Sequence, residues 1–209
     1  ERYRIVNNDQ ELNEALEHFK KYDPSPMIEE YVQGDGVGVS FLLDKNSRVR
    51  CVFSHKRLVE YPINGGPSAC LETFFDNDLI ERAVGFIEKT GFEGLLMLEF
   101  KKSKDKYYLL EINPRVWGSF PAVEKARSNI LSCYYNSSKN IDKPFSSEYK
   151  NGVRIKFLRG MLAAFFASLK KRRLRKALRI FWYTVNPCIR FALFSVNDPM
   201  PAIRDFFRR

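Results

Sequence analysis

Histidine is scarce in this sequence of 209 residues, which contains only His18 and His55. Zinc centres and Ser-His-Asp hydrolases use histidine as a ligand or a base, so its scarcity argues against both classes. The four cysteines show neither metal-ligand nor redox spacing. Their arrangement predicts a reducing, cytoplasmic setting in which they stay as thiols.

Long apolar runs are lacking as well. The most apolar segments lie near the C-terminus, where Arg179, the Asn186-Pro187 pair and Arg190 interrupt them before they reach the length that spans a bilayer. No secretory signal opens the chain, so we expect a soluble protein. Because the first residue is Glu1 and not methionine, we also expect a fragment of a longer protein.

Acidic residues are nearly absent from the last part of the chain. Residues 151–209 hold 14 lysines and arginines but only Asp198 and Asp205, whereas residues 1–150 hold 21 basic and 23 acidic residues. The net charge of +10 therefore comes from the C-terminal part. With 44% hydrophobic residues the chain can bury a substantial core, and one or two domains are expected.

The basic excess is concentrated in residues 170–179, between two aromatic segments. We expect helices with one cationic side here, and three interpretations remain open: a solvated helix face, a patch at an anionic membrane surface, or a nucleic-acid contact. The sequence argues against nucleic acid, because no recognised binding module accompanies the charge. A cytoplasmic protein is expected, with a peripheral position at the membrane as an option.

Hydrophobic periodicity predicts alternating helices and strands in the first two thirds of the chain. Helical spacing occurs in residues 9–22 and 77–90, and Asp76 stands where the second helix needs an N-cap. A further short helix is expected over residues 121–127. Strands are predicted at Met27–Val32, Val37–Leu43 and Arg50–Leu58.

These elements predict a mixed α+β fold with an antiparallel sheet and flanking helices, followed by a basic helical region. Three parts are expected along the chain: an α+β domain over residues 1–135, a polar linker over residues 136–152 and the basic helical region over residues 153–209.

Two apolar segments with acidic residues at fixed places, Leu95–Phe100 and Tyr107–Asn113, are the most informative part of the sequence. The polar turn between them allows them to pair as antiparallel strands. If this turn centres near Asp105, Glu99 and Glu111 stand opposite each other, where two like charges repel unless a cation joins them.

Side-chain alternation predicts which residues of this hairpin share a face. Three oxygen donors on one face, without histidine or thiolate, suit Mg²⁺ or Mn²⁺ better than zinc. The alternative is that Glu99 and Glu111 are exposed and neutralised by neighbouring lysines. The first face is expected to hold Met97, Glu99, Leu109, Glu111 and Asn113, and the core face Leu98, Phe100, Tyr108, Leu110 and Ile112.

The ordered set of motifs resembles the ATP-grasp superfamily over about residues 1–125. The motifs are Ile28-Glu29-Glu30-Tyr31-Val32, a glycine-bearing turn, Leu98-Glu99-Phe100 and Glu111-Ile112-Asn113-Pro114-Arg115. The resemblance implies that ATP lies between two α+β subdomains and that a carboxylate is activated as an acylphosphate, which an amine then attacks.

The resemblance also implies roles for individual residues. Glu99, Glu111 and Asn113 are the expected metal ligands. Glu29, Glu30, Tyr31 and Val32 are the expected adenine contacts, with Asp35 near the ribose in place of the acid that many members carry at the position of Gly36. Arg115 is expected over the acceptor carboxylate, and Lys56 and Arg57, with the Gly65-Gly66-Pro67-Ser68 loop, are expected to contact substrate or phosphate. For Glu29, Glu30 and Arg115 an ordinary surface role is the alternative, and for the loop a purely structural one.

Within the superfamily, the segments around Lys56 and Arg115 resemble the carbamoyl-phosphate-synthase-like branch, which includes carboxylate-amine ligases. An ATP- and Mg²⁺-dependent ligase with a small carboxylate and an amine as substrates is therefore expected. The family's phosphate-binding lysine and glycine loop precede the segment that resembles Arg4–Asn8, so this chain alone is expected to be inactive. The alternative function is a noncatalytic nucleotide-binding or membrane-tethering module.

Overall fold

The computed structural model describes residues 3–62, 65–139, 141 and 148–207, and the chain forms two compact units, Glu1–Gln33 and Gly34–Arg209. In the first unit, α1 spans Asp9–Phe19. The Asn8 side chain caps it by accepting a hydrogen bond from the backbone N–H of Glu11 at 2.9 Å. Ala15 is the buried residue of this helix, so the predicted helix is confirmed but ends three residues early.

The strand predicted at Met27–Val32 is wrong. The segment has no regular secondary structure and forms no ladder with another segment, and Met27, Ile28 and Tyr31 are exposed. A β-strand needs a hydrogen-bonded neighbour, and the described residues of the first unit contain no second strand. The apolar pattern thus marks a segment without a sheet around it.

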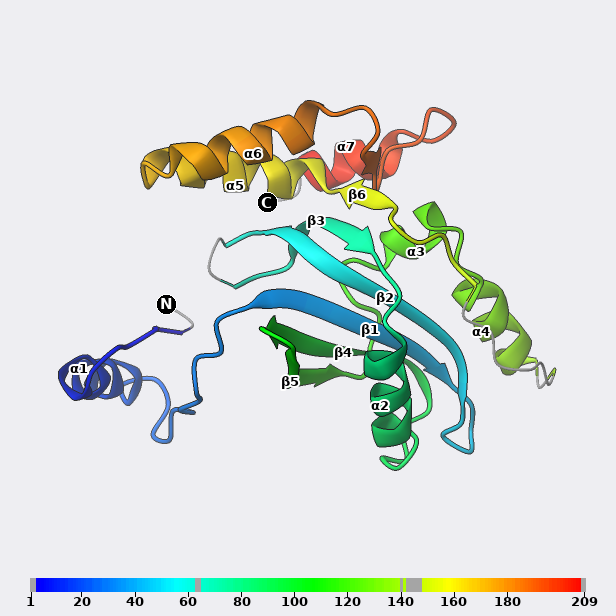
Figure 1. Ribbon diagram of the computed structural model, residues 1–209, viewed down its shortest axis with the longest axis horizontal. Helices are drawn as coiled ribbons and strands as arrows, with labels where there is room; N and C mark the ends of the chain where they lie inside the picture. The colour runs from blue at the N-terminus through cyan, green and yellow to red at the C-terminus, as the bar shows by residue number, and fades with distance from the viewer. Residues whose placement is uncertain (1–2, 63–64, 140, 142–147, 208–209) are drawn as a thin grey trace. The chain divides into compact units, whose positions relative to one another are not determined.

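The second unit is built on one sheet of seven strands in the order β5-β4-β1-β2-β3-β6-β7 (Figure 1). All neighbours are antiparallel except β6 and β7, which are parallel. The mixed α+β prediction is confirmed. The strands are β1 Asp35–Leu43, β2 Val49–Glu60, β3 Ser68–Thr73, β4 Gly94–Ser103, β5 Lys106–Asn113, β6 Arg154–Lys156 and β7 Arg190–Phe191.

Helix α2, Asn77–Ile87, covers one face of this sheet. Asp76 caps it as predicted, because its carboxylate accepts from the backbone N–H of Leu79 at 3.1 Å. The apolar stripe of α2 packs against alternate residues of the central strands, such as Val39 of β1 and Leu98 of β4. Burial of this stripe holds α2 on the sheet.

The opposite face is covered at one end by two short helices, α3 Pro121–Lys125 and α4 Ile130–Ser138. Their apolar residues and Trp117 pack on Phe53 of β2 and Met97 of β4. The next residues on this face of the two strands are His55 and Glu99, where the apolar cluster ends. The functional residues described below begin where this apolar cluster ends.

The C-terminal region is helical, as predicted, but it also adds β6 and β7 to the sheet edge beside β3. Helices α5 Leu158–Lys170 and α6 Leu174–Val185 lie side by side near β3, and α7 spans Met200–Phe207 (Figure 1). Met161 and Ile180 pack with Cys70 of β3 in a third apolar cluster. The predicted boundaries of the linker stay a prediction, and its residues 140 and 142–147 lie outside the described residues.

None of the helices in the described part of the chain is both long and apolar enough to cross a membrane.

Candidate functional site

The acidic hairpin has the turn and register that the sequence predicts. Lys104 and Asp105 form a two-residue turn between β4 and β5, and Lys104 has a φ of 53°, as hairpin turns of this length require. Glu99 stands directly opposite Glu111, and Met97 stands opposite Asn113. Because residues two apart share a face, Glu99, Glu111 and Asn113 lie on the same side of the sheet.

A β-bulge in β5 changes the rest of the predicted alternation. Glu99 pairs with Glu111 but Phe100 pairs with Leu109, which leaves Leu110 as the extra residue. The prediction that Tyr108 and Leu110 face the core is therefore wrong, and both are exposed. Tyr107 packs against the core instead, where its hydroxyl donates to Asp76 at 2.7 Å. Leu109, predicted on the acidic face, stands opposite Phe100 on the core side.

Two glycines in β1 leave this face of the sheet without side chains between β2 and β4. Gly38 stands opposite both His55 of β2 and Glu99 of β4, and Gly36 stands opposite Lys101. A Cβ atom on Gly38 would lie 2.5 Å from the His55 ring, and one on Gly36 would lie 2.4 Å from a Glu60 carboxylate oxygen. Only glycine leaves room at these positions for long side chains to reach across the strand.

Arg57 of β2 uses this space to reach the acidic hairpin. Its guanidinium pairs with the Glu99 carboxylate at 2.7 Å, and the Asn113 side-chain amide donates to the other Glu99 oxygen at 3.3 Å. Glu60 lies 3.6 Å from Arg57 and 3.5 Å from the Lys101 ammonium. The carboxylate of Glu99 is thus oriented by two donors, with charges of both signs around it.

The predicted glycine loop touches this group through Arg57. The Arg57 guanidinium donates to the backbone carbonyl of Gly66 at 3.1 Å, while its Nε atom is buried without a hydrogen-bond partner. The contact uses a carbonyl of the loop and not the N–H groups that cradle anions. Residues 63 and 64 of this loop lie outside the described residues.

His55 forms the floor of this end of the sheet and was missed as a site residue by the sequence reasoning. It is fully buried, and its Nε2 atom lies 3.4 Å from the Ser119 hydroxyl. Burial lowers the pKa of His55 from 6.5 to about 3, and the positive charge of Arg57 acts in the same direction. The ring is therefore neutral at ordinary pH. The signal in the sequence was the pair of glycines at alternate positions of β1, Gly36 and Gly38. Glycines in a strand indicate that a side chain of a neighbouring strand comes close, as the His55 ring does here.

The donors on the acidic face fit a hard divalent cation. The described residues contain no cluster of three or more histidine, cysteine, aspartate or glutamate side chains that could hold a metal. The predicted set is of another kind, because it consists of two carboxylates and one amide. Glu99 is held by Arg57 and Asn113, whereas the exposed Glu111 side chain has no hydrogen bond or ion pair among the described residues. Mg²⁺ typically takes one or two carboxylates plus phosphate oxygens, and this set matches that preference.

Three other predicted residues of the second unit are not brought to this group. Lys56 points to the opposite face of β2, where it pairs with Glu72 at 2.6 Å. Arg115 is exposed and donates to the neighbouring Val116 carbonyl at 3.3 Å. Asp35 is exposed at the start of β1, opposite Lys102. In the first unit Glu29, Glu30 and Tyr31 are exposed and Val32 is half-buried.

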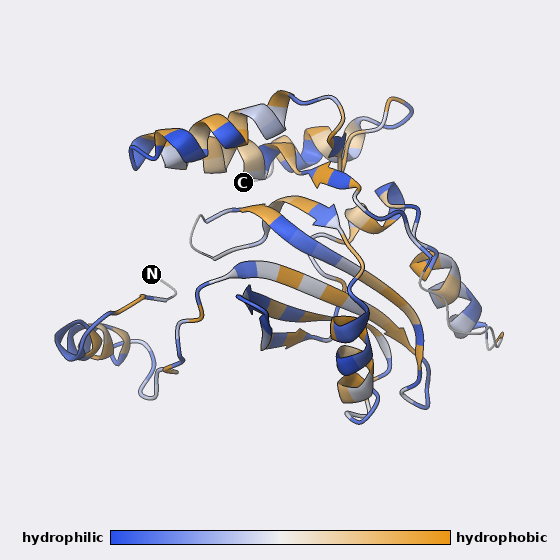
Figure 2. Cartoon of the chain, in the orientation of Figure 1, coloured by the Kyte–Doolittle hydropathy of each residue, from blue (hydrophilic) through white to orange (hydrophobic). Residues whose placement is uncertain are grey.

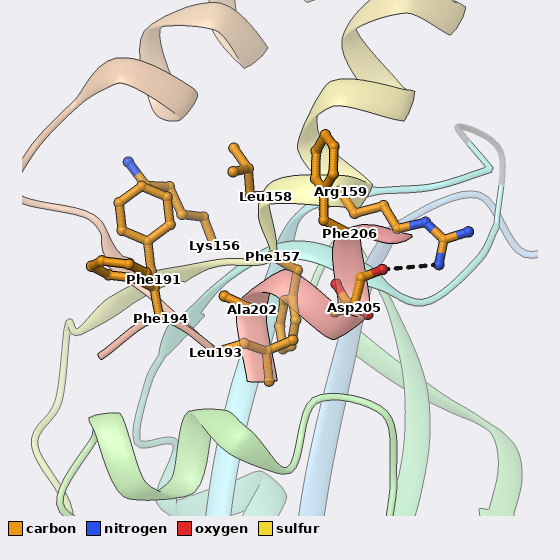
Figure 3. Close-up of a pocket in the computed structure, with 10 residues that line it drawn as sticks. All are labelled: Lys156, Phe157, Leu158, Arg159, Phe191, Leu193, Phe194, Ala202, Asp205 and Phe206. Carbon is orange, nitrogen blue, oxygen red and sulfur yellow. Dashed lines mark hydrogen bonds between the residues drawn. The ribbon is translucent and has the colours of Figure 1, made fainter. Parts of the chain in front are cut away.

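A separate pocket of about 270 Å³ lies in the C-terminal region (Figure 3). Its walls are mainly apolar and include Phe157 just before α5, Phe191 of β7, Phe194 just after β7 and Phe206 of α7. The Arg159 guanidinium donates to the backbone carbonyl of Asp205 at 3.3 Å. The buried Lys156 ammonium donates to the carbonyls of Thr184 and Asn186, at the end of α6. The pocket contains none of the predicted site residues.

The sheet, the helices on its two faces and the paired acidic strands define an ATP-grasp type of domain. The family described as "ATP-grasp in the biosynthetic pathway with Ter operon" matches residues 23–161, and the chain belongs to this family. The recognition from sequence motifs is therefore confirmed. No curated protein shows significant similarity to the chain.

Solved structures share the fold. The biotin carboxylase of Campylobacter jejuni, crystallised as a β-γ-ATP complex, superposes with a TM-score of 0.57 at 17% identity. The match covers 72% of this chain and 37% of the enzyme. The chain thus spans about a third of the length of that relative.

Proposed function

We propose that the protein is an ATP- and Mg²⁺-dependent ligase that joins a carboxylate to an amine through an acylphosphate. Family membership supports ATP-dependent chemistry of the ligase type. One observation carries the finer proposal: Glu99, Glu111 and Asn113 converge on one face of the hairpin, with Arg57 bonded to Glu99. Acidic and basic groups placed together in this way suit a bound metal-phosphate complex.

The proposed reaction has two steps. An oxygen of the acceptor carboxylate attacks the γ-phosphorus of ATP, and the bond from that phosphorus to the bridging oxygen breaks to release ADP. The amine then attacks the acyl carbon, the bond from that carbon to the phosphate oxygen breaks, and phosphate leaves while the amine loses a proton. Mg²⁺, when bound with ATP, neutralises charge on the β- and γ-phosphates.

The chain's own residues have distinct parts in this proposal. Glu99, Glu111 and Asn113 would hold the metal, and the ion pair with Arg57 orients the Glu99 carboxylate. The exposed Arg115 would exchange its hydrogen bond to the Val116 carbonyl for two parallel hydrogen bonds to the acceptor carboxylate. Adenine contacts by residues 29–32, a ribose contact by Asp35 and a substrate contact by Lys56 are further parts of the proposal that rest on the family resemblance.

The test measures release of ADP and phosphate by the whole protein, and in parallel nucleotide binding by calorimetry across a Mg²⁺ series. Glu111→Gln removes a charged ligand without changing its shape, so we expect the Mg²⁺ concentration needed for binding to rise at least about tenfold. Asn113→Ala should act in the same direction. The matched control is Glu81→Gln, which removes an exposed carboxylate from α2 on the other face of the sheet.

The outcomes separate the proposal from its rival. Mg²⁺-dependent binding and turnover that are both lost in Glu111→Gln and kept in Glu81→Gln support the ligase. Equal behaviour of the two variants rejects the metal site. Nucleotide binding without turnover, with every carboxylate and amine tried, favours the noncatalytic nucleotide-binding module.

A further inference from the structure

The C-terminal region has a long segment without negative charge. Residues 149–197 contain 12 lysines and arginines and no aspartate or glutamate. Solvated helices of ordinary domains carry charges of both signs, which limits their own repulsion. A stretch of one sign therefore needs a negatively charged partner or pays a cost in self-repulsion.

Helix α6 in the middle of this segment exposes an apolar stripe. Leu174, Leu178, Phe181 and Val185 follow one another at intervals of four, three and four residues, which places them on one face, and Trp182 lies beside them. Each of the five is more than half exposed. Ala177 and Ile180, on another side of the helix, are the residues buried in the core.

Helix α5 extends the stripe and does not cover it. Its Phe166 is exposed, and Phe165 links the two helices through ring contacts with Phe166 at 5.4 Å and with Phe181 at 6.1 Å between centroids. Figure 2 shows hydrophobic and hydrophilic residues alternating along this helix pair. A contiguous exposed apolar surface of this kind marks an interaction site.

Exposed cations border the stripe. Lys170, Lys171 and Arg172 lie at the turn between α5 and α6, and Arg175 and Arg179 lie one turn apart on α6. None of these five forms an ion pair within the part of the chain that the structure describes. They are therefore available to an external anion.

Lys176 lies among these cations, and its pKa is below the ordinary value of a lysine. Burial lowers it first, and the nearby Arg173 and Arg179 lower it further. Part of this lowering therefore comes from the positive charge that surrounds Lys176, which a negatively charged partner would offset.

We propose that the exposed face of α6 is a docking surface for an anionic lipid bilayer, on which the helix lies parallel to the membrane plane. Large apolar residues enter the boundary between headgroups and acyl chains, and the flanking lysines and arginines meet the lipid phosphates. Nucleic acid is a poorer match, because Leu174, Leu178 and Val185 stand between the aromatic residues of the stripe and offer no stacking surface to bases. This docking surface is independent of the ligase proposal, since it lies in the C-terminal helices and shares no residue with the acidic hairpin.

The first experiment follows the fluorescence of Trp117 and Trp182, the two tryptophans of this chain, as vesicles are added. Trp182 is 63% exposed and Trp117 is 2% exposed, so a blue shift of the emission reports Trp182 entering lipid. We expect the shift with vesicles that contain phosphatidylserine and not with vesicles of phosphatidylcholine alone. Trp182→Phe should abolish the shift while sedimentation with the vesicles persists. High salt should weaken the association.

The second experiment tests whether vesicle binding depends on the five cations that border the stripe or only on the net charge of the protein. A variant with residues 170, 171, 172, 175 and 179 changed to glutamine should lose at least about tenfold in affinity for the phosphatidylserine vesicles. The control removes the same number of positive charges from exposed positions elsewhere in the second unit, and it should bind within about twofold of the unmodified protein. The control positions are Lys45, Arg48, Lys89, Lys104 and Lys106.

Three results would overturn the proposal. The first is the absence of vesicle binding by the whole protein together with tight binding of an oligonucleotide. The second is self-association that shields Trp182 in the absence of lipid, which would assign the face to a second copy of the chain. The third is equal loss of vesicle binding in the two charge variants, because the attraction would then not depend on α6.

Discussion

Arg57 reaches Glu99 across an intervening strand, and the 2.7 Å ion pair passes over β1 where that strand has Gly36 and Gly38. The pair joins two strands that are not neighbours in the sheet. The orientation of Glu99, a proposed metal ligand, therefore depends on the two glycines that leave room for the Arg57 side chain. The space above β1 is therefore a structural requirement of the candidate site.

Filling that space should destabilise the fold. In Gly38→Ala the new Cβ would lie 2.5 Å from the His55 ring, which is fully buried and has little room to move. We expect a loss of about 1–3 kcal/mol in the free energy of unfolding, measured by urea denaturation. Gly85→Ala is the control: nothing lies within 4 Å of its added Cβ in helix α2, so it should stabilise by about 0.5–1 kcal/mol. A neutral Gly38→Ala would contradict the close approach.

Removing the Arg57 charge should cost more stability than removing the Lys56 charge next to it. The Arg57 side chain is only 11% exposed and holds Glu99, whereas the Lys56 side chain is 42% exposed and pairs with Glu72 on the other face. We expect Arg57→Gln to lower the free energy of unfolding by about 1–3 kcal/mol and Lys56→Gln by less than about 1 kcal/mol. Thermal and urea unfolding of the two variants compare them directly. Equal losses would show that the Arg57 pair is no stronger than a surface contact.

Protonation of His55 should make the fold sensitive to acid. The pKa of His55 is about 3 in the folded protein and 6.5 when exposed, so the unfolded chain binds the proton first as pH falls. The free energy of unfolding should therefore decline between about pH 6.5 and 3, by up to about 1.4 kcal/mol per pH unit, and be unaffected by this group above that range.

His55→Gln tests this assignment by urea denaturation at a series of pH values. The variant should lose the part of the slope that belongs to His55, while His18→Gln, in α1 of the other unit, should keep it. Identical pH profiles for His55→Gln and the unmodified protein would be inconsistent with a buried neutral ring.

Asp76 should stabilise two elements at once. Its carboxylate accepts from the Leu79 N–H at the start of α2 and from the Tyr107 hydroxyl of β5 at 2.7 Å. We expect Asp76→Ala to lower the free energy of unfolding by about 1–3 kcal/mol, because a helix cap and a partly buried hydrogen bond are both lost. Asp78→Ala removes only an exposed pair with Arg82 and should change stability by less than about 0.5 kcal/mol. Similar losses in both variants would argue against the cap.

The local patterns of the acidic hairpin predicted its turn and the opposition of Glu99 to Glu111, because turn length fixes register. They could not predict the bulge at Leu110, which depends on how Tyr107 packs against Phe100 and Asp76. The predicted faces were therefore right from Glu111 to Asn113 and wrong at Tyr108, Leu109 and Leu110.

Long-range contacts account for the remaining differences. The short strand β6 has no distinctive alternation, and it is a strand because β3 offers it an edge. The sequence indicates His55 only as a scarce residue and as part of the His55-Lys56-Arg57 segment that resembles the carbamoyl-phosphate-synthase-like branch. Its burial could not be predicted, since it follows from the pairing of β2 with the glycines of β1. Arg57 was predicted as a site residue together with Lys56, and strand alternation sends the two to opposite faces.

The pairing of β6 with β3 has a practical consequence for anyone who wishes to work with a shorter piece. A chain cut after residue 152 would leave the backbone hydrogen-bonding groups of Cys70 to Glu72 open along a sheet border, where a second molecule can add its own strand. Aggregation of such a piece would reflect the unpaired edge of β3 and not a failure of the central strands to form. The family match extends to residue 161, beyond this strand, so the smallest tractable version should keep it.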